Sequence, residues 1–266
     1  MANVFALTYP EAKSVVISGD IHGDFNELVF KLCIQHQMTD TLLVVAGDCG
    51  FGFEKKEYYE QMLRRNAKRL NEANNWVVFV RGNHDNPAYF DGVTFKHKRM
   101  TCVPDYTVLQ ACNHTILCVG GGISIDRKVR MEAWGKKKAK HGFDSNSNEG
   151  IPRAYYWPDE TPVYDEKKMD AIRSAYSIDT VITHTAPSYC ELQTKGGLTR
   201  WTADDPALMT DVQAERATMD QLFKRLQADL HPVSHWYYGH FHQSWHSAID
   251  GILYRMLYIM EFCMVY

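Results

Sequence analysis

Five short apolar runs of this 266-residue chain each end in a small polar motif. In chain order the motifs are Gly19-Asp20-Ile21-His22-Gly23, Gly47-Asp48, Arg81-Gly82-Asn83-His84-Asp85, Thr183-His184 and Gly239-His240-Phe241-His242. Short apolar runs are typical of strands buried in a sheet, so each polar group is expected where a strand ends and a loop begins. One such motif is common, whereas five in this order are hard to obtain by chance.

The first third of the chain alternates predicted strands with predicted helices. Strands are expected at 15–17, 42–46 and 76–80, where the apolar residues are continuous. A helix with capping-box spacing is expected to begin at Asp24, and a charged helix is expected over 55–73. Continuous apolar strands separated by helices indicate a sheet that is covered on both faces.

Regular structure continues in the second half of the chain. Strands are predicted at 115–119, 180–183 and 235–238, and the spacing of apolar residues over 219–226 predicts an amphipathic helix. Asp250-Gly251 separates two further apolar segments and is the strongest short signal for a hairpin turn. The chain is therefore expected to end in antiparallel strands.

The segment 123–162 differs from its surroundings, because it is polar, basic and interrupted by Gly, Ser, Asn and Pro. A connection of this length inside a compact domain is usually functional or disordered. We expect a substrate-facing loop or small cap within a single domain covering 1–266. A solvated surface excursion is the alternative.

The composition describes an ordinary globular protein. A net charge of −3 and a pI near 6.4 argue against a chain built mainly to coat nucleic acid or anionic membrane. The seven cysteines are scattered, with no C-x-x-C pair, and are typical of a reducing compartment. No apolar run approaches the roughly 20 residues of a membrane span. A cytoplasmic protein without a membrane partner is the expectation.

The residue types of the motifs suggest metal binding. In Asp20-x-His22, alternation along a strand end would turn both side chains to the same side, where they could share one ion. The pair His240-x-His242 repeats this spacing with two imidazoles. Nitrogen and oxygen donors without thiolate suit Mn, Fe, Zn or Co better than a purely structural zinc site.

In their order, the motifs D-x-H, GD, GNHD, H and GHxH resemble those of the calcineurin-like metallophosphoesterases. This superfamily includes serine/threonine protein phosphatases, phosphodiesterases and DNA-processing nucleases. The matching motifs span residues 20–242, which is most of the chain. The resemblance implies an α/β fold of four layers, α/β/β/α, in which two mixed sheets pack face to face with helices outside. The predicted C-terminal antiparallel hairpin is consistent with it.

The resemblance also implies two divalent metal ions that share Asp48. One ion would be held by Asp20, His22, Asp48 and His242. The other would be held by Asp48, Asn83, His184 and His240. Manganese is the expected metal, with iron, zinc, cobalt or nickel as alternatives. Two cations a few ångströms apart can lower the pKa of a shared water and direct it at phosphorus.

The same resemblance assigns roles to neighbouring residues. His84 would be the catalytic imidazole near the leaving group, and Asp85 would orient it. Arg81 would contact phosphate, as the arginine before GNH does in protein phosphatases. The stretch that begins at Gly121 resembles a substrate-side loop of bacterial and phage-type members, so Arg127 and Arg130 are further candidates for contact with a phosphate or nucleotide.

The chain is therefore expected to be an enzyme that hydrolyses phosphate esters. Arg81 favours a monoester substrate, as in the protein phosphatases. The basic stretch 127–140 permits a phosphodiester, in a nucleotide or nucleic acid, although the net charge does not favour nucleic acid. A non-catalytic scaffold of the same fold is a further alternative, but such a protein should lack a metal ligand or an equivalent of His84.

Overall fold

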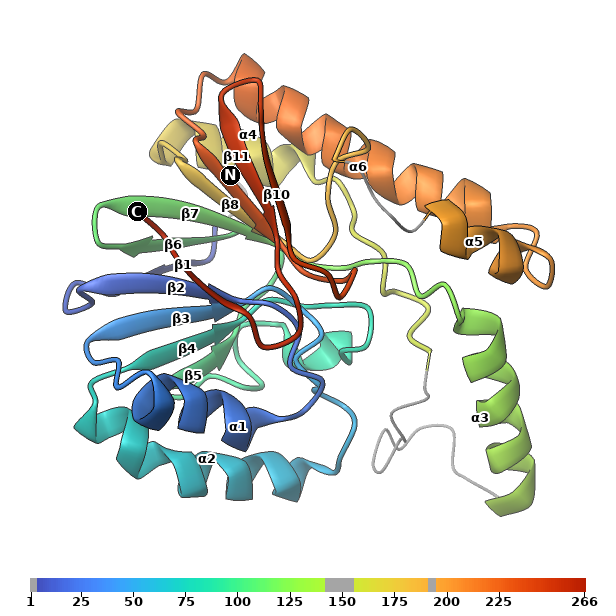
Figure 1. The fold of residues 1–266 in the computed structure, drawn as a ribbon, viewed down its shortest axis with the longest axis horizontal. Coiled ribbons are helices and arrows are strands. Elements are labelled where there is room, and N and C mark those ends of the chain that lie inside the picture. Colours follow the sequence, from blue (N-terminus) through green and yellow to red (C-terminus); the bar gives the residue numbers. More distant parts are fainter. Residues whose placement is uncertain (1–3, 142–155, 191–194) are drawn as a thin grey trace.

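Two sheets lie face to face, and helices cover their outer faces (Figure 1). The computed structural model describes residues 4–141, 156–190 and 195–266. The four layers and the hairpin near the C-terminus confirm the α/β/β/α sandwich that the sequence predicted.

The first sheet has five strands in the order β12-β2-β3-β4-β5. They are β2 (Ser14–Ser18), β3 (Thr41–Val45), β4 (Trp76–Phe79), β5 (Met100–Cys102) and β12 (Phe262–Met264). Strands β2 to β5 run parallel, and β12 pairs with β2 in the antiparallel sense. The carboxyl ends of β2, β3 and β4 therefore lie at one edge of the sandwich.

The second sheet has seven strands in the order β1-β6-β7-β8-β9-β11-β10. They are β1 (Ala6–Thr8), β6 (Thr107–Ala111), β7 (His114–Val119), β8 (Thr180–Thr183), β9 (His235–Tyr238), β10 (Trp245–Ile249) and β11 (Ile252–Met256). Strands β7, β8 and β9 are parallel neighbours, and β10 and β11 form the predicted antiparallel hairpin. The carboxyl ends of β7 to β9 thus also share one edge.

The continuous apolar strands are explained by burial on both faces. Successive residues of a strand point to opposite faces of the sheet. In β2, Ile17 packs between the sheets with Ile116 and Ile182 of the second sheet. Its neighbour Val16 packs on the other side, in the core under the outer helices. A strand buried in this way has no polar face, as the sequence indicated.

Two pairs of helices form the outer layers. The first sheet is covered by α1 (Phe25–Phe30) and α2 (Lys56–Glu72), and the second by α4 (Glu166–Ala175) and α6 (Leu208–Ala228). Helix α1 continues as a π-helical turn, η1 (Lys31–Gln35), and a 3₁₀ turn, η2 (Pro87–Tyr89), follows the third motif. Among the described residues, no helix combines the length and the apolar character needed to cross a membrane.

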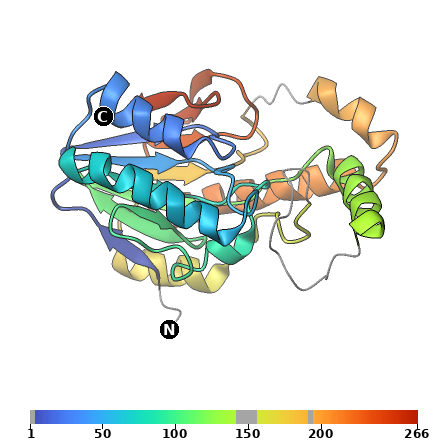
Figure 2. The same cartoon turned by 90° about the horizontal axis from the view of Figure 1, so that it is seen from below.

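Two more helices, α3 (Arg127–His141) and α5 (Lys195–Thr202), lie beyond the carboxyl ends of the strands (Figures 1 and 2). Helix α3 forms part of the segment 123–162, for which the sequence predicted a substrate-facing loop or small cap. Residues 142–155 lie outside the described residues. Helix α3 is rich in strong helix formers such as Lys, Arg, Met and Ala. Its apolar residues Val129 and Met131 are exposed, so the sequence lacks the apolar face by which a helix is recognised.

Candidate metal centre

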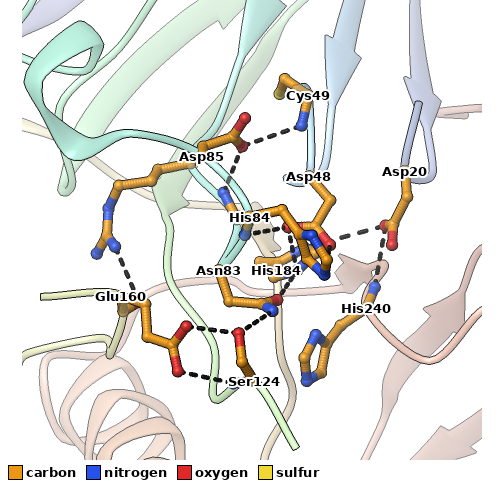
Figure 3. A network of polar contacts seen from close by, with 12 residues as sticks. Asp20, Asp48, Cys49, Asn83, His84, Asp85, Ser124, Glu160, His184 and His240 are labelled. Atoms are coloured by element: carbon orange, nitrogen blue, oxygen red, sulfur yellow. Dashed lines mark hydrogen bonds and ion pairs between the residues drawn. The ribbon is translucent and has the colours of Figure 1, made fainter. Parts of the chain in front are cut away.

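The polar residues of the five motifs meet at the edge where the parallel strands of both sheets end. The residues that follow β2, β3, β4, β8 and β9 include Asp20, Asp48, Asn83, His184 and His240. Strand direction and face-to-face packing bring these loops together, although they are far apart in the sequence (Figure 3).

Four of the predicted ligands form a first cluster, consisting of Asp20, His22, Asp48 and His242. Each offers one oxygen or ring nitrogen, and these four atoms all lie within 4.8 Å of one another. Nε2 of His242 lies 3.0 Å from Oδ2 of Asp20 and 3.0 Å from Nε2 of His22. Two imidazoles and two carboxylates at this spacing form a donor set for a divalent metal such as Mn or Zn.

The second cluster shares Asp48 and adds Asn83, His184 and His240. Nδ1 of His184 donates a hydrogen bond of 2.8 Å to the carbonyl oxygen of Ala46, which leaves Nε2 as the free ring nitrogen. This Nε2 lies 2.9 Å from Oδ1 of Asn83 and 3.3 Å from Oδ1 of Asp48. The ring centroids of His184 and His240 are 4.8 Å apart. The structure therefore brings all seven predicted ligands together.

Two atoms indicate that the clusters fit cations. Oδ2 of Asp20 is buried, and its contact of 3.0 Å with Nε2 of His242 lacks the geometry of a hydrogen bond. Nε2 of His184 is flanked by oxygen atoms, so it needs a proton or a cation. Burial lowers the pKa of His184, but the carboxylates of Asp48 and Asp20 outweigh burial and raise it to about 10. A divalent cation in each cluster would occupy these lone pairs in place of protons.

Four residues of the two clusters have a left-handed backbone. The φ angles are 46° at His22, 46° at Asp48, 69° at His240 and 50° at His242. Residues other than glycine seldom adopt this conformation, and such strain is concentrated at functional sites. The sequence-based reason for pairing Asp20 with His22 is therefore wrong, because β2 has already ended. Left-handed turns, and not strand alternation, bring the side chains together.

Two glycines allow the loops to approach one another. A Cβ atom at Gly82 would lie 2.2 Å from Oδ1 of Asp48, and one at Gly239 would lie 2.2 Å from Oδ1 of Asp20. These distances are far shorter than a van der Waals contact. Both positions therefore require a residue without a side chain.

His84 lies beside both clusters. Its backbone N–H donates a hydrogen bond of 2.9 Å to Oδ1 of Asp48, and its Nε2 lies 3.7 Å from Oδ2 of the same residue. A guanidinium N–H of Arg130 contacts the same Nε2. Burial lowers the pKa of His84 to about 4, with Asp48 opposing and Arg130 reinforcing this shift. The imidazole is thus neutral and accepts from Arg130.

The predicted role of Asp85 is contradicted by the structure. Its carboxylate does not orient His84, because it accepts hydrogen bonds of 2.7–3.0 Å from the backbone N–H groups of Cys49, Gly50, Phe51 and Gly82. Asp85 is fully buried, and burial raises its pKa to about 6. It holds the loop that follows Asp48 against the loop of the GNHD motif.

Arg81 was predicted to contact phosphate, but the structure directs it away from the clusters. Its guanidinium donates to the carbonyl oxygens of Asp159 and Glu160, at 3.1 and 2.8 Å, and pairs with Asp105 at 3.0 Å. Burial lowers the pKa of Arg81, but Asp105 outweighs burial and raises it. Arg81 therefore fastens the segment around Glu160 to the first sheet.

The two arginines of α3 have different surroundings. Arg127 pairs with Asp205 and Asp211, each at 2.6 Å, so it ties α3 to the start of α6 and does not face the clusters. Arg130 does reach the site, where its Nε pairs with Asp126 at 2.8 Å. Its Nη1 is buried without a hydrogen-bond partner. Of the predicted substrate-binding arginines, the structure brings only Arg130 to the metal clusters.

A family comparison agrees with this geometry. Residues 13–244 match the family model for calcineurin-like phosphoesterases. The chain belongs to the calcineurin-like phosphoesterase family. It is therefore a metal-dependent hydrolase of phosphate esters, which confirms the enzyme class expected from the five motifs.

Two solved structures show the relation of this calcineurin-like phosphoesterase to known folds. A dimetal phosphatase from Danio rerio is 11% identical, with 94% of this chain and 88% of that chain covered and a TM-score of 0.51. A phosphopantetheinyl hydrolase from Mycobacterium tuberculosis is 14% identical, with 92% and 89% covered and a TM-score of 0.39. The first likeness agrees with the fold, and neither identifies a substrate.

Five of the predicted ligands line a pocket of about 400 Å³, namely His22, Asp48, Asn83, His240 and His242. Its lining also includes Arg130 and three apolar side chains, Ile125, Trp201 and Phe241. The sequence did not predict these apolar residues. Phe241 lies inside the GHxH motif, which could have identified it, but Trp201 reaches the pocket only through the placement of α5.

Two further buried residues, Ser124 and Glu160, were also missed. They connect to Asn83 in the network shown in Figure 3. The Gly-rich turn after β7 indicated a loop close to the substrate, but nothing local pairs Ser124 with an acid 36 residues away. Their connection depends on the tertiary fold.

Proposed function

We propose that this phosphoesterase hydrolyses phosphate monoesters at a dinuclear metal centre. The first cluster, Asp20, His22, Asp48 and His242, would hold one divalent cation. The second, Asp48, Asn83, His184 and His240, would hold the other. Such a pair supplies positive charge for the phosphoryl oxygens and acidifies a shared water. Mn²⁺ is the metal we propose, with Fe, Zn, Co or Ni as alternatives, because the donors are nitrogen and oxygen without thiolate.

Arg130 is the observation that carries the monoester assignment. It is 7% exposed, its Nη1 lacks a partner, and it lines the pocket that contains the clusters. A guanidinium with an unused N–H is suited to bind a phosphoryl oxygen. Two divalent cations and Arg130 could together bind three phosphoryl oxygens. A monoester has three oxygens without a substituent, whereas a diester has two.

His84 is the proposed partner of the leaving group. Its Nε2 accepts an N–H of Arg130 in this structure. When a phosphoryl oxygen takes that N–H, the lone pair of Nε2 becomes free. The negative charge of the phosphate would then let Nε2 take up a proton from water and pass it to the leaving oxygen. Ile125, Trp201 and Phe241 give the same pocket an apolar lining in which a small organic substituent fits.

A diesterase or nuclease is the alternative reaction. It would use the basic stretch 127–140, but Arg127 is paired with Asp205 and Asp211, and Lys128 donates to the carbonyl oxygen of Asp204. Arg127 and Lys128 are therefore engaged within the protein, although Lys136 of the same stretch is exposed. Arg81, the sequence-based reason for a monoester, does not face the pocket, and Arg130 takes its place in the proposal.

The test compares an aryl phosphate monoester with the matching diester, using metal-stripped protein with and without Mn²⁺. We expect Mn²⁺ to restore turnover and the monoester to be preferred. Arg130→Ala should lower kcat/KM for the monoester about 10- to 100-fold, the range for a lost hydrogen bond to a charged group. Lys136→Ala, an exposed cation of the same helix, is the control. Preference for the diester, or an unaffected Arg130→Ala enzyme, would refute the monoester assignment.

A further inference from the structure

Three buried side chains beside the second cluster form a chain of hydrogen bonds: Asn83, Ser124 and Glu160 (Figure 3). Nδ2 of Asn83 donates to Oγ of Ser124 at 2.8 Å, and this Oγ donates to Oε2 of Glu160 at 2.6 Å. The backbone N–H of Ser124 donates to Oε1 of Glu160 at 2.7 Å. The residues are 2%, 1% and 0% exposed. Since they are sealed from water, the bonds among them fix their orientations.

The direction of these bonds follows from the single hydrogen of the serine hydroxyl. Two cations bound beside it would favour the ionised form of Glu160. That carboxylate only accepts, so the hydroxyl hydrogen of Ser124 points towards Glu160. A lone pair of Oγ remains for Asn83, which must therefore present its N–H to Ser124. The amide oxygen of Asn83 consequently faces the other way, 2.9 Å from Nε2 of His184. An amide oxygen can coordinate a divalent cation, whereas an amide NH₂ group cannot.

We propose that Glu160 is a positioning residue that makes Asn83 present its oxygen to the second cation, acting through Ser124. The inference rests on the metal centre proposed above. Among the described contacts, Glu160 touches neither cluster directly. Its carbonyl oxygen accepts from Arg81 at 2.8 Å and from the N–H of Gly122 at 3.0 Å. These bonds hold Glu160 in place and give the buried Arg81 a function.

Burying an ionisable acid at position 160 costs free energy of folding, which argues that the carboxylate itself is needed there. Without metal, burial raises the pKa of Glu160 to about 8, while the two bonds from Ser124 and the charge of Arg130 oppose the shift. Burying such a group destabilises the fold unless it is fully paired. A glutamine would fit the space, but it could not accept from both the hydroxyl and the N–H of Ser124.

Two variants test the direction of the hydrogen bonds between Asn83, Ser124 and Glu160. In Glu160→Gln, Oε1 still accepts from the N–H of Ser124, so Nε2 donates to Oγ. The hydroxyl hydrogen is then directed at Asn83, whose amide must turn its nitrogen to the cation. Ser124→Ala only cuts the chain and leaves Asn83 free to turn. We expect the affinity for the second cation to fall from the wild type to Ser124→Ala and further to Glu160→Gln, within the 10- to 100-fold range typical of changes around metal ligands.

The double variant Glu160→Gln/Ser124→Ala separates this inference from a structural role. Without Oγ, the glutamine can no longer impose the wrong amide orientation, so the double variant should bind the second cation as well as Ser124→Ala alone. Glu215→Gln is the matched control, because Glu215 is a buried acid of α6 that also lies near His184 but outside the chain. It should weaken the second cation much less than Glu160→Gln does.

The measurement is a titration of metal-stripped protein with Mn²⁺, followed by calorimetry and electron paramagnetic resonance. Wild-type-like binding by Glu160→Gln, or a double variant that binds no tighter than Glu160→Gln, would overturn the inference while leaving the metal centre intact. If the wild type itself bound fewer than two Mn²⁺ ions, the proposed metal centre would fail instead.

Discussion

The two clusters share Asp48 but differ in how the fold holds their other members. In the first cluster, the side chains of His22 and His242 are 23% and 44% exposed. In the second, His184 is fully buried and Asn83 is 2% exposed. The second cluster is thus more enclosed than the first, although its His240 is partly exposed.

The ligands of the second cluster are also oriented by further bonds. His184 is fixed by the carbonyl oxygen of Ala46, and Asn83 is fixed by Ser124. Bonds of this kind set the direction of a metal ligand and raise its affinity. We therefore expect the second cation to bind more tightly and the first to exchange more readily. The predictions below test this difference.

The largest effect is expected where the two clusters meet. Asp48→Asn removes the carboxylate that both clusters use, so both cations and all turnover should be lost. The backbone N–H of His84 would still find an acceptor oxygen, and the fold should remain. Metal content by mass spectrometry and circular dichroism check this result. Retention of two cations by the variant would show that Asp48 does not bridge them.

A large effect without loss of metal is expected at His84. His84→Asn should lower kcat by about 10²–10⁴-fold, the usual contribution of a proton-transferring group, while both Mn²⁺ ions remain bound. The loss should be greater for an alkyl phosphate than for a nitrophenyl phosphate, whose leaving group needs less help. Equal losses for both esters would contradict a role at the leaving group.

The smallest effect concerns the stability of the metal-free protein. The pKa of Glu160 is about 8 in the fold, above its ordinary value of 4.5, so the native state holds this proton more tightly than the unfolded chain. Its favourable contribution is present below about pH 4.5 and is lost as the pH rises through 8. Glu160→Gln avoids this loss, so its Tm relative to the wild type should rise between pH 6 and pH 9. Each kcal/mol corresponds to roughly 2–4 °C.

Thermal unfolding without metal at the two pH values provides the measurement. Lys136→Ala, whose side chain is exposed, serves as the control and should show no such pH-dependent difference. A constant Tm difference between Glu160→Gln and the wild type would contradict the raised pKa.

The ligands could be predicted from the sequence because each belongs to a short motif at a strand end. The four-layer architecture was implied by the resemblance of these motifs to those of the calcineurin-like phosphoesterases. The continuous apolar runs of β2, β3 and β4 indicated only a sheet covered on both faces. The strands β1, β5, β6 and β12 were missed, and all but the five-residue β6 have only three residues. A strand this short leaves no periodic pattern, and its pairing is decided by the sheet beside it.

The surroundings of the ligands could not be predicted, because they depend on distant contacts. Arg81 has the sequence position of a phosphate-binding arginine, yet Asp105 and the carbonyl oxygen of Glu160 draw it away. Asp85 follows His84 directly but is saturated by backbone N–H groups. A motif specifies which residues lie near one another, whereas the fold determines which atoms they face.

The central claim is that two distinct cation sites share one carboxylate, and titration of metal-stripped protein with Mn²⁺ tests it most directly. The wild type should bind two ions, the tighter one in the second cluster. His242→Ala should lose the weaker ion and keep the tighter one, and His184→Ala should lose the tighter one. Binding of fewer than two ions by the wild type, or loss of the same ion in both variants, would contradict the account.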